Sequence, residues 1–96
     1  MFTPHAAAGY TEPIPGIRMK TLTWGDKTLL TEFALEAGRE LPMHRHPHEQ
    51  IGYLVSGRLR LRIGERTHEV APGDSWCIPG DVLHGADVLA PAVAID

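Results

Sequence analysis

Hydrophobic and polar residues alternate with a period of two along most of the chain, and glycines and prolines interrupt this pattern at short intervals. Such alternation is typical of half-buried β-strands, whereas no stretch of ten or more residues has the 3.6-residue period of a helix. In residues 29–35 one face carries four mostly apolar side chains, namely Leu29, Thr31, Phe33 and Leu35. The pattern predicts an all-β sandwich or small barrel of about eight short strands.

Turn residues predict how these strands pair. Gly25-Asp26 separates residues 17–24 from residues 29–35, and this turn pair favours a hairpin of two antiparallel strands. Ser56-Gly57 interrupts a second apolar run in the same way, and we interpret it as another turn.

A hairpin with a defined register is predicted for residues 58–70, with Gly64-Glu65 as its two-residue loop. In this register Arg60 lies opposite Glu69 on the outer face, and Leu61 lies opposite His68 on the inner face. His68 is therefore expected to be packed or half-exposed rather than a metal ligand. The arginines alternate with apolar residues, which indicates the solvated face of a strand rather than a basic patch for nucleic acid.

Length and composition limit the protein to one domain. Its 96 residues can bury a single modest core, with 43% hydrophobic and 22% charged residues. Residues 1–16 contain Pro4, Pro13 and Pro15 and predict an extended N-terminal arm, and residues 17–96 form the domain. A formal charge of −3 gives no reason to expect nucleic acid. No signal-peptide pattern or membrane-length apolar run is present, so a cytoplasmic location without membrane contact is expected.

The single cysteine, Cys77, cannot form an internal disulfide bond. Alternation places Cys77 and Ser75 on one face of a strand. Because free cysteine is among the most often buried residue types, we expect Cys77 to be packed rather than reactive.

A cluster of imidazoles marks the candidate site, in the segment "MHRHPHEQIGY" of residues 43–53. His44 and His46 are two residues apart, so on a strand their side chains point the same way and can share a metal ion. Pro47 interrupts strand pairing, which leaves the direction of the following side chains open. Downstream, the turn at Pro79-Gly80 presents His84 as a further candidate.

These segments resemble the two motifs of the cupin superfamily. "GRELPMHRHPHEQIGYLVSG" is similar to the first motif and "GDSWCIPGDVLH" to the second, with Asp81 where the second motif usually has glycine. The resemblance implies a double-stranded β-helix, or jelly roll, of the RmlC-like type. The segment "HPHEQ" is similar to that of small single-domain cupins of pectin degradation, and this resemblance implies His44, His46, Gln50 and His84 as metal ligands.

Such a ligand set suits one divalent first-row metal, whether Mn, Fe, Ni, Zn or Cu. Three neutral imidazoles and an amide leave the site with a charge of about +2, which favours a small anionic substrate and a Lewis-acid role for the metal. Glu49 is an alternative to Gln50 if the backbone bulges after Pro47. Otherwise Glu49 is expected to orient a ligating imidazole or to be solvated, and His48 to lie outside the ligand set.

The resemblance implies an isomerase or tautomerase that acts on a small sugar acid or keto acid. In that subset the last strand continues through an aspartate, an aromatic residue and an arginine, and here Asp96 matches the aspartate while the other two have no counterpart. The resemblance therefore implies either a domain that is short at this end or a pocket that does without these two residues. Asp96 is the candidate acid or base. Two alternatives remain: an iron or copper dioxygenase acting on an enolisable diketone or flavonol, and a non-catalytic metal-dependent binding module. We also expect a homodimer, because joined sheets cover strand edges.

Overall fold

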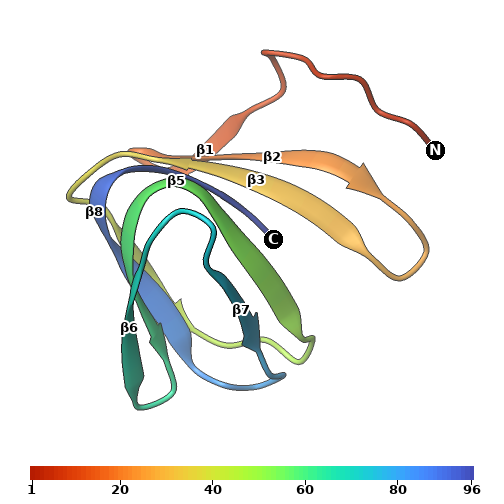
Figure 1. Ribbon diagram of the computed structural model, residues 1–96. Coiled ribbons are helices and arrows are strands. Elements are labelled where there is room, and N and C mark those ends of the chain that lie inside the picture. The colour runs from red at the N-terminus through yellow and green to blue at the C-terminus, as the bar shows by residue number, and fades with distance from the viewer.

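The computed structural model describes residues 1–96 and consists of β-strands and connecting segments, with no helix (Figure 1). This confirms the predicted all-β fold. The strands are β1 (Thr11–Ile14), β2 (Ile17–Trp24), β3 (Leu29–Leu35), β4 (Glu40–His44), β5 (Gln50–Ile63), β6 (Arg66–Val70), β7 (Ser75–Ile78) and β8 (His84–Ile95). The structure has no helix that is long and apolar enough to span a membrane.

The eight strands form one antiparallel sheet that rolls up on itself. Its order is β1-β2-β3-β8-β5-β6, with β4 paired to β8 and β7 paired to β5. The rolled sheet has two facing layers, and the long strands β5 and β8 contribute to both. The first half of β5 pairs with β7 and with the end of β8, whereas its second half pairs with β6 and with the start of β8. Figure 1 shows β5 and β8 curving together through the molecule, which closes the jelly roll.

Strand β5 continues through Ser56-Gly57, so the turn predicted there is wrong. Gly57 has φ = 89°, and a Cβ at this position would lie 2.2 Å from the carbonyl oxygen of Pro91 on β8. The pairing of β5 with β8 shifts on both sides of this residue. Gly57 therefore allows a β-bulge that bends β5 where it lies against Pro91 of β8. The sequence pattern alone does not distinguish this bulge from a turn that reverses the chain.

Both predicted hairpins are confirmed. Strands β2 and β3 pair antiparallel across residues 25–28. Strands β5 and β6 pair in the predicted register, and the Arg60 guanidinium lies 3.6 Å from the Glu69 carboxylate. His68 does lie opposite Leu61, but it is fully exposed, whereas it was expected to be packed or half-exposed. The reason is that β6 is an edge strand with β5 as its one neighbour, so little covers its inner face near the hairpin end.

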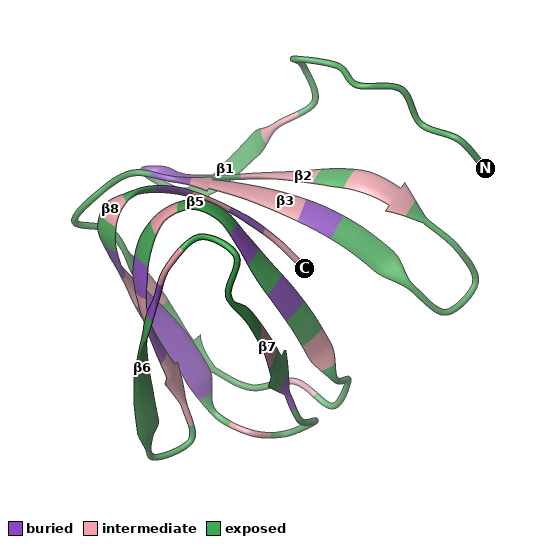
Figure 2. Ribbon diagram, in the orientation of Figure 1, coloured by how far each residue is buried: buried purple, intermediate pink, exposed green.

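The core lies between the two layers and draws on β2, β3, β5, β6 and β8 (Figure 2). Leu54 of β5 is fully buried, and its neighbours Tyr53 and Val55 on the opposite face are exposed. On β7 the inner positions belong to Trp76 and Ile78, so Cys77 is exposed and the expectation that it is packed is wrong. Alternation groups the side chains of a strand correctly, but it does not say which group faces the core.

Residues 1–10 have no regular secondary structure, and a few side-chain contacts join them to β2 and β3. The Tyr10 hydroxyl donates a hydrogen bond to the Glu32 carboxylate, and the Lys20 ammonium donates one to the carbonyl oxygen of Ala6. Within the segment predicted as an extended arm, residues 11–14 form strand β1, which pairs with β2.

Candidate metal centre

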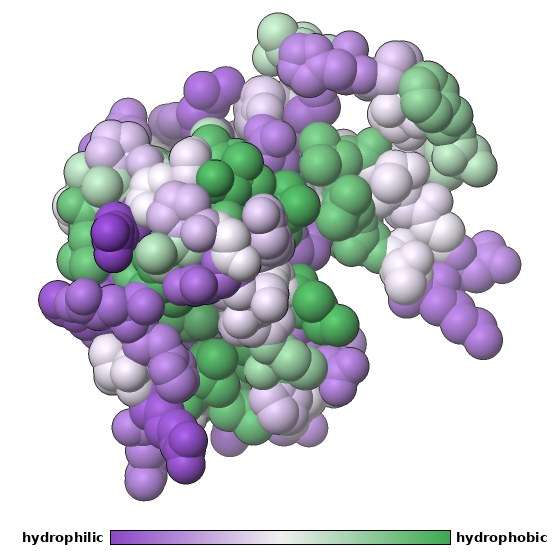
Figure 3. Space-filling view, in the orientation of Figure 1, coloured by the Kyte–Doolittle hydropathy of each residue, from purple (hydrophilic) through white to green (hydrophobic).

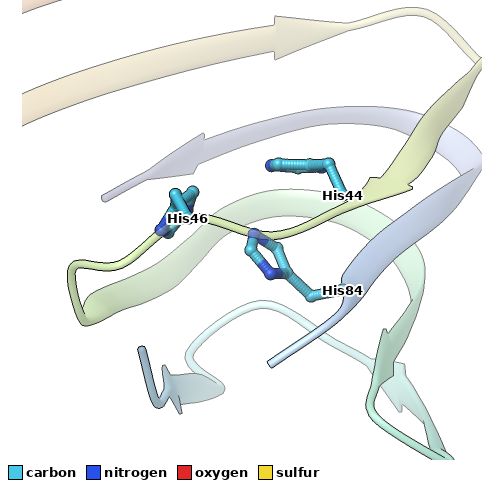
Figure 4. A group of neighbouring side chains, drawn as sticks. All are labelled: His44, His46 and His84. Carbon is cyan, nitrogen blue, oxygen red and sulfur yellow. The ribbon is translucent and has the colours of Figure 1, made fainter. Parts of the chain in front are cut away.

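Three histidines from separate parts of the fold converge at one end of the barrel. His44 is the last residue of β4, His84 is the first residue of β8, and these two residues are paired in register. His46 lies in the loop between β4 and β5. One ring nitrogen from each histidine lies within 4.8 Å of the others, and Figure 4 shows the three rings gathered around a common space.

The prediction that His44 and His46 share a strand is wrong, because β4 ends at His44. His46 is held by the second motif instead: the Asp81 amide donates a hydrogen bond of 2.7 Å to the His46 carbonyl oxygen. Gly80 permits this approach, since a Cβ there would lie 2.3 Å from the carbonyl oxygen of Pro47. Asp81 adopts φ = 64°, a conformation that glycine enters most easily, which fits the glycine usual at this motif position.

Backbone carbonyl groups select the same tautomer for all three rings. In each histidine the Nδ1 atom lies 2.9 Å from a carbonyl oxygen. A carbonyl oxygen can only accept, so each Nδ1 carries the hydrogen and each neutral ring keeps a free electron pair on Nε2. This is the state in which histidine binds a metal ion. The pairs are His44 with Pro42, His46 with His48, and His84 with Val82.

His84 gives the strongest sign that the space between the rings suits a cation. The side chain is 4% exposed, and its Nε2 atom is buried without a hydrogen-bond partner. Burial lowers the pKa of His84, and the neighbouring His44 and His46 lower it further, so the ring is neutral at pH 7. A buried acceptor without a donor is unfavourable unless a cation binds it. The residues present therefore fit a divalent metal ion.

Gln50 presents its amide oxygen to the same space. Its Oε1 atom lies 3.0 Å from Nε2 of His46, and its amide nitrogen donates a hydrogen bond to Oδ2 of Asp96. With the hydrogen of His46 on Nδ1, the facing Nε2 and Oε1 atoms are both acceptors. A cation bound here would take an electron pair from each of these two atoms and so remove the unfavourable contact between two acceptors.

Asp96 lies behind Gln50, where its backbone exchanges two hydrogen bonds with Thr31 of β3. Burial raises the pKa of Asp96 to about 6, although the hydrogen bond from Gln50 acts in the opposite direction. The carboxyl group is therefore close to half-protonated just below neutral pH. Because the Gln50 amide donates its hydrogen bond to one carboxylate oxygen, Oδ2, it fixes the orientation of the carboxyl group.

The two other candidates near the cluster lie outside the group of converging atoms. Glu49 is exposed and is not among the residues that the fold brings together. His48 is exposed as well, and its ring stacks on His46 with the centroids 3.9 Å apart and the planes at 4°. His48 therefore supports His46 by stacking and through its carbonyl oxygen.

A cavity of about 260 Å³ opens next to the histidines and is lined in part by His44, Gln50, His84 and Asp96. Met19 of β2 and Phe33 of β3 also line it, and sequence reasoning did not assign either to the site. The inward alternation of Phe33 was visible in the sequence, but no pattern indicated that it faces the histidines. A second hollow, of about 410 Å³, lies beside β6 and β7 and contains none of the converging histidines.

The family model for the cupin domain matches residues 31–96. The chain belongs to the cupin family. This cupin aligns over its whole length with KdgF from Halomonas sp., covering 91% of that chain at 26% identity and a TM-score of 0.93. It also resembles an RmlC-like cupin from Shewanella frigidimarina at 22% identity and a TM-score of 0.88, covering 93% of this chain and 80% of that one.

A third solved structure is the polyketide cyclase RemF from Streptomyces resistomycificus, at 25% identity and a TM-score of 0.79. The alignment covers 99% of this cupin and 77% of that chain. These likenesses confirm the jelly-roll fold and the family expected from the two motifs. Because these similar structures carry different names, the shared fold does not identify a reaction, which has to be argued from the site itself.

Proposed function

We propose that this cupin is a metal-dependent isomerase or tautomerase that acts on a small anionic keto acid or sugar acid. The observation that carries the proposal is the arrangement of an uncharged ligand set beside a buried carboxyl group. His44, His46, His84 and Gln50 would hold one divalent ion of the series Mn, Fe, Ni, Zn and Cu. These ligands are neutral, so the ion keeps a charge of about +2 toward an anion.

When bound, such an ion polarises a carbonyl group and stabilises the negative charge that forms when a neighbouring proton is removed. The chain itself supplies the proton acceptor. Asp96 offers Oδ1, which makes no hydrogen bond, while Oδ2 is held by Gln50. In the metal-free protein burial raises the pKa of this carboxyl group to about 6, and a carboxylate with a raised pKa is a better proton acceptor that can return the proton to another atom.

The cavity wall and the fixed ring of His84 also contribute to the proposed reaction. The cavity wall around the histidines is mostly apolar, so a bound substrate displaces water from the space beside Asp96. His84 is buried and fixed by its hydrogen bond to Val82, and therefore keeps its electron pair directed at one place.

The experiment that tests this function has two stages. Protein without a histidine tag is first analysed for metal content, and we expect about one ion per chain in the wild type and none in His84→Ala. The loaded protein is then incubated with α-keto acids in deuterium oxide, and exchange of the hydrogens next to the carbonyl group is followed by NMR. Asp96→Asn should keep the metal and lose at least about 100-fold in exchange rate.

The possible results separate the proposed function from its alternatives. Iron or copper together with oxygen uptake on a diketone would replace the isomerase by a dioxygenase. Bound metal without hydrogen exchange on any keto acid or uronate would leave a non-catalytic binding module. An empty protein that takes up none of the five metals would show that the ligand set is wrong.

We further propose that the protein is a homodimer that joins through the outer face of β5 and β7. Ile51, Tyr53 and Val55 are 65%, 44% and 49% exposed, and Ile51 pairs in register with the exposed Cys77. This stripe carries no charged side chain, so two copies can meet there around a twofold axis without burying a charge. Figure 3 shows hydrophobic surface where the barrel meets the protruding β2–β3 hairpin.

A further inference from the structure

The wall of the cavity beside the histidines is polar at one end and apolar elsewhere. Ten of its fifteen lining residues are hydrophobic, and none is lysine or arginine. The polar side chains are His44, His84, Gln50 and Asp96. The ring centroids of His44 and His84 lie 4.2 Å apart, and Gln50 donates a hydrogen bond to Asp96. All four side chains therefore lie at the candidate metal centre.

Away from that end the wall offers almost no hydrogen-bonding side chain. It is built from Met19, Phe33 and aliphatic residues of β3, β4, β5, β7 and β8. The single exception is the indole of Trp76, which is packed so closely against β5 that a Cβ on Gly52 would lie 2.2 Å from the ring. This contact limits how far the indole can turn toward a ligand.

A substrate hydroxyl placed against this wall would lose its hydrogen bonds to water and find no partner in return. A carboxylate placed there would lack an arginine or lysine to balance its charge. Both groups are therefore restricted to the polar end, where a metal ion and Asp96 can meet them. A hydrocarbon chain or ring, by contrast, gains from leaving water at every position along the wall.

Resting on the proposed function, we infer that the substrate is an α-keto acid with an apolar body rather than a polyhydroxylated sugar acid. Its carboxylate and keto oxygens face the ligand set, and its hydrocarbon part lies against Met19 and Phe33. Met19 and Phe33 then determine specificity, although neither contacts the reacting atoms.

The test compares two ligands that share one carbon skeleton: the straight-chain six-carbon α-keto acid and its counterpart with hydroxyl groups on the last three carbons. Binding to metal-loaded protein is measured by titration calorimetry. The indole N–H signal of Trp76 is followed by NMR, with Trp24 as an internal reference because it is 57% exposed at the tip of the β2–β3 hairpin. We expect the unsubstituted acid to bind about 10- to 100-fold more tightly and to shift the signal of Trp76 alone.

A variant sharpens the assignment. Met19→Gln places an amide on the wall at nearly constant volume and should reduce the preference between the two acids at least about threefold. Leu89→Gln makes the same change at a residue that is 41% exposed and outside the cavity, and it should leave the preference unchanged.

The outcomes distinguish this inference from the proposed function. Equal binding, or tighter binding of the hydroxylated acid, would overturn the apolar substrate class and leave the metal-dependent keto-acid function standing. If neither acid binds to protein that demonstrably contains metal, the proposed function fails and this inference fails with it. A tenfold preference that Met19→Gln reduces and Leu89→Gln does not would support both.

Discussion

The two faces of the first half of β5 show how differently this protein uses apolar residues. On the inner face, Leu54 is fully buried and Gln50 reaches the histidine cluster. On the outer face, Ile51, Tyr53 and Val55 are all exposed. A polar side chain thus faces the interior while three large apolar ones face outward, which is the reverse of what hydrophobic burial alone would produce.

This difference indicates that each face has a second task besides folding. The inner face combines core packing with a site, because Gln50 at one end of the same strand completes the candidate ligand set. The outer face has no such chemistry, and its apolar stripe is explained by the proposed contact with a second copy. The following predictions separate these roles, beginning with the largest expected effect.

Shortening a side chain should destabilise the protein on the inner face only. We expect Leu54→Ala to lower the free energy of unfolding by about 2 to 5 kcal/mol, because it removes packing at a fully buried position. The matched change Val55→Ala should cost no more than about 0.5 kcal/mol in dilute protein. Urea denaturation measures both values, and equal losses would contradict the assignment of the two faces.

Removing the buried imidazole should abolish metal binding. His84→Ala is expected to weaken the affinity for a divalent metal ion by more than about 100-fold, because it deletes a ligand atom that the fold already directs into the site. His68→Ala is the control, since His68 is exposed on β6 and outside the cluster. A competition titration with a chelating dye gives both affinities. Similar affinities for both variants would exclude His84 as a ligand.

The carboxyl group of Asp96 should make the stability of the metal-free protein depend on pH. Its pKa rises from 3.8 to about 6 on folding, so the folded state holds the proton more tightly than the unfolded state does. The resulting stabilisation is present below pH 4 and is lost as the pH rises through 6, with a total of the order of 3 kcal/mol.

Asp96→Asn should flatten this part of the profile while keeping a polar contact with Gln50. The difference between wild type and variant, measured by urea denaturation between pH 4 and 7, isolates the effect from that of other carboxyl groups. A constant difference over this range would mean that the Asp96 pKa is not raised by burial.

The smallest effect is expected on the outer face. Val55→Lys should weaken association of two chains by at least about tenfold, because each copy would bring a charge to the apolar stripe. Leu89→Lys, at another exposed apolar position of β8, should leave association unchanged. Sedimentation at several protein concentrations measures both. A Val55→Lys protein that dimerises like the wild type would place the contact elsewhere, and metal content should be equal in all three proteins.

Sequence patterns predicted the strands and the β5–β6 register well, because alternation and a two-residue loop are local features. They failed where a distant part of the chain decides the outcome. Ser56-Gly57 reads as a turn, but contact with Pro91 makes it a bulge within β5. Cys77 was expected to be packed and His68 to be packed or half-exposed, yet β7 and β6 present these side chains to solvent.

For the candidate site, the sequence by itself determined which side chains are available and their order: the imidazoles before and after Pro47, Gln50, and His84 behind the Pro79-Gly80 turn. Spacing and residue type carry this information because they follow from covalent connectivity. Only the tertiary structure decided that His46 reaches the cluster from a loop, that His84 holds a buried free electron pair, and that Met19 and Phe33 form the opposite wall. These facts depend on how β2, β3 and β8 pack together, and residues far apart in the chain acquire a common environment only when the sheet closes.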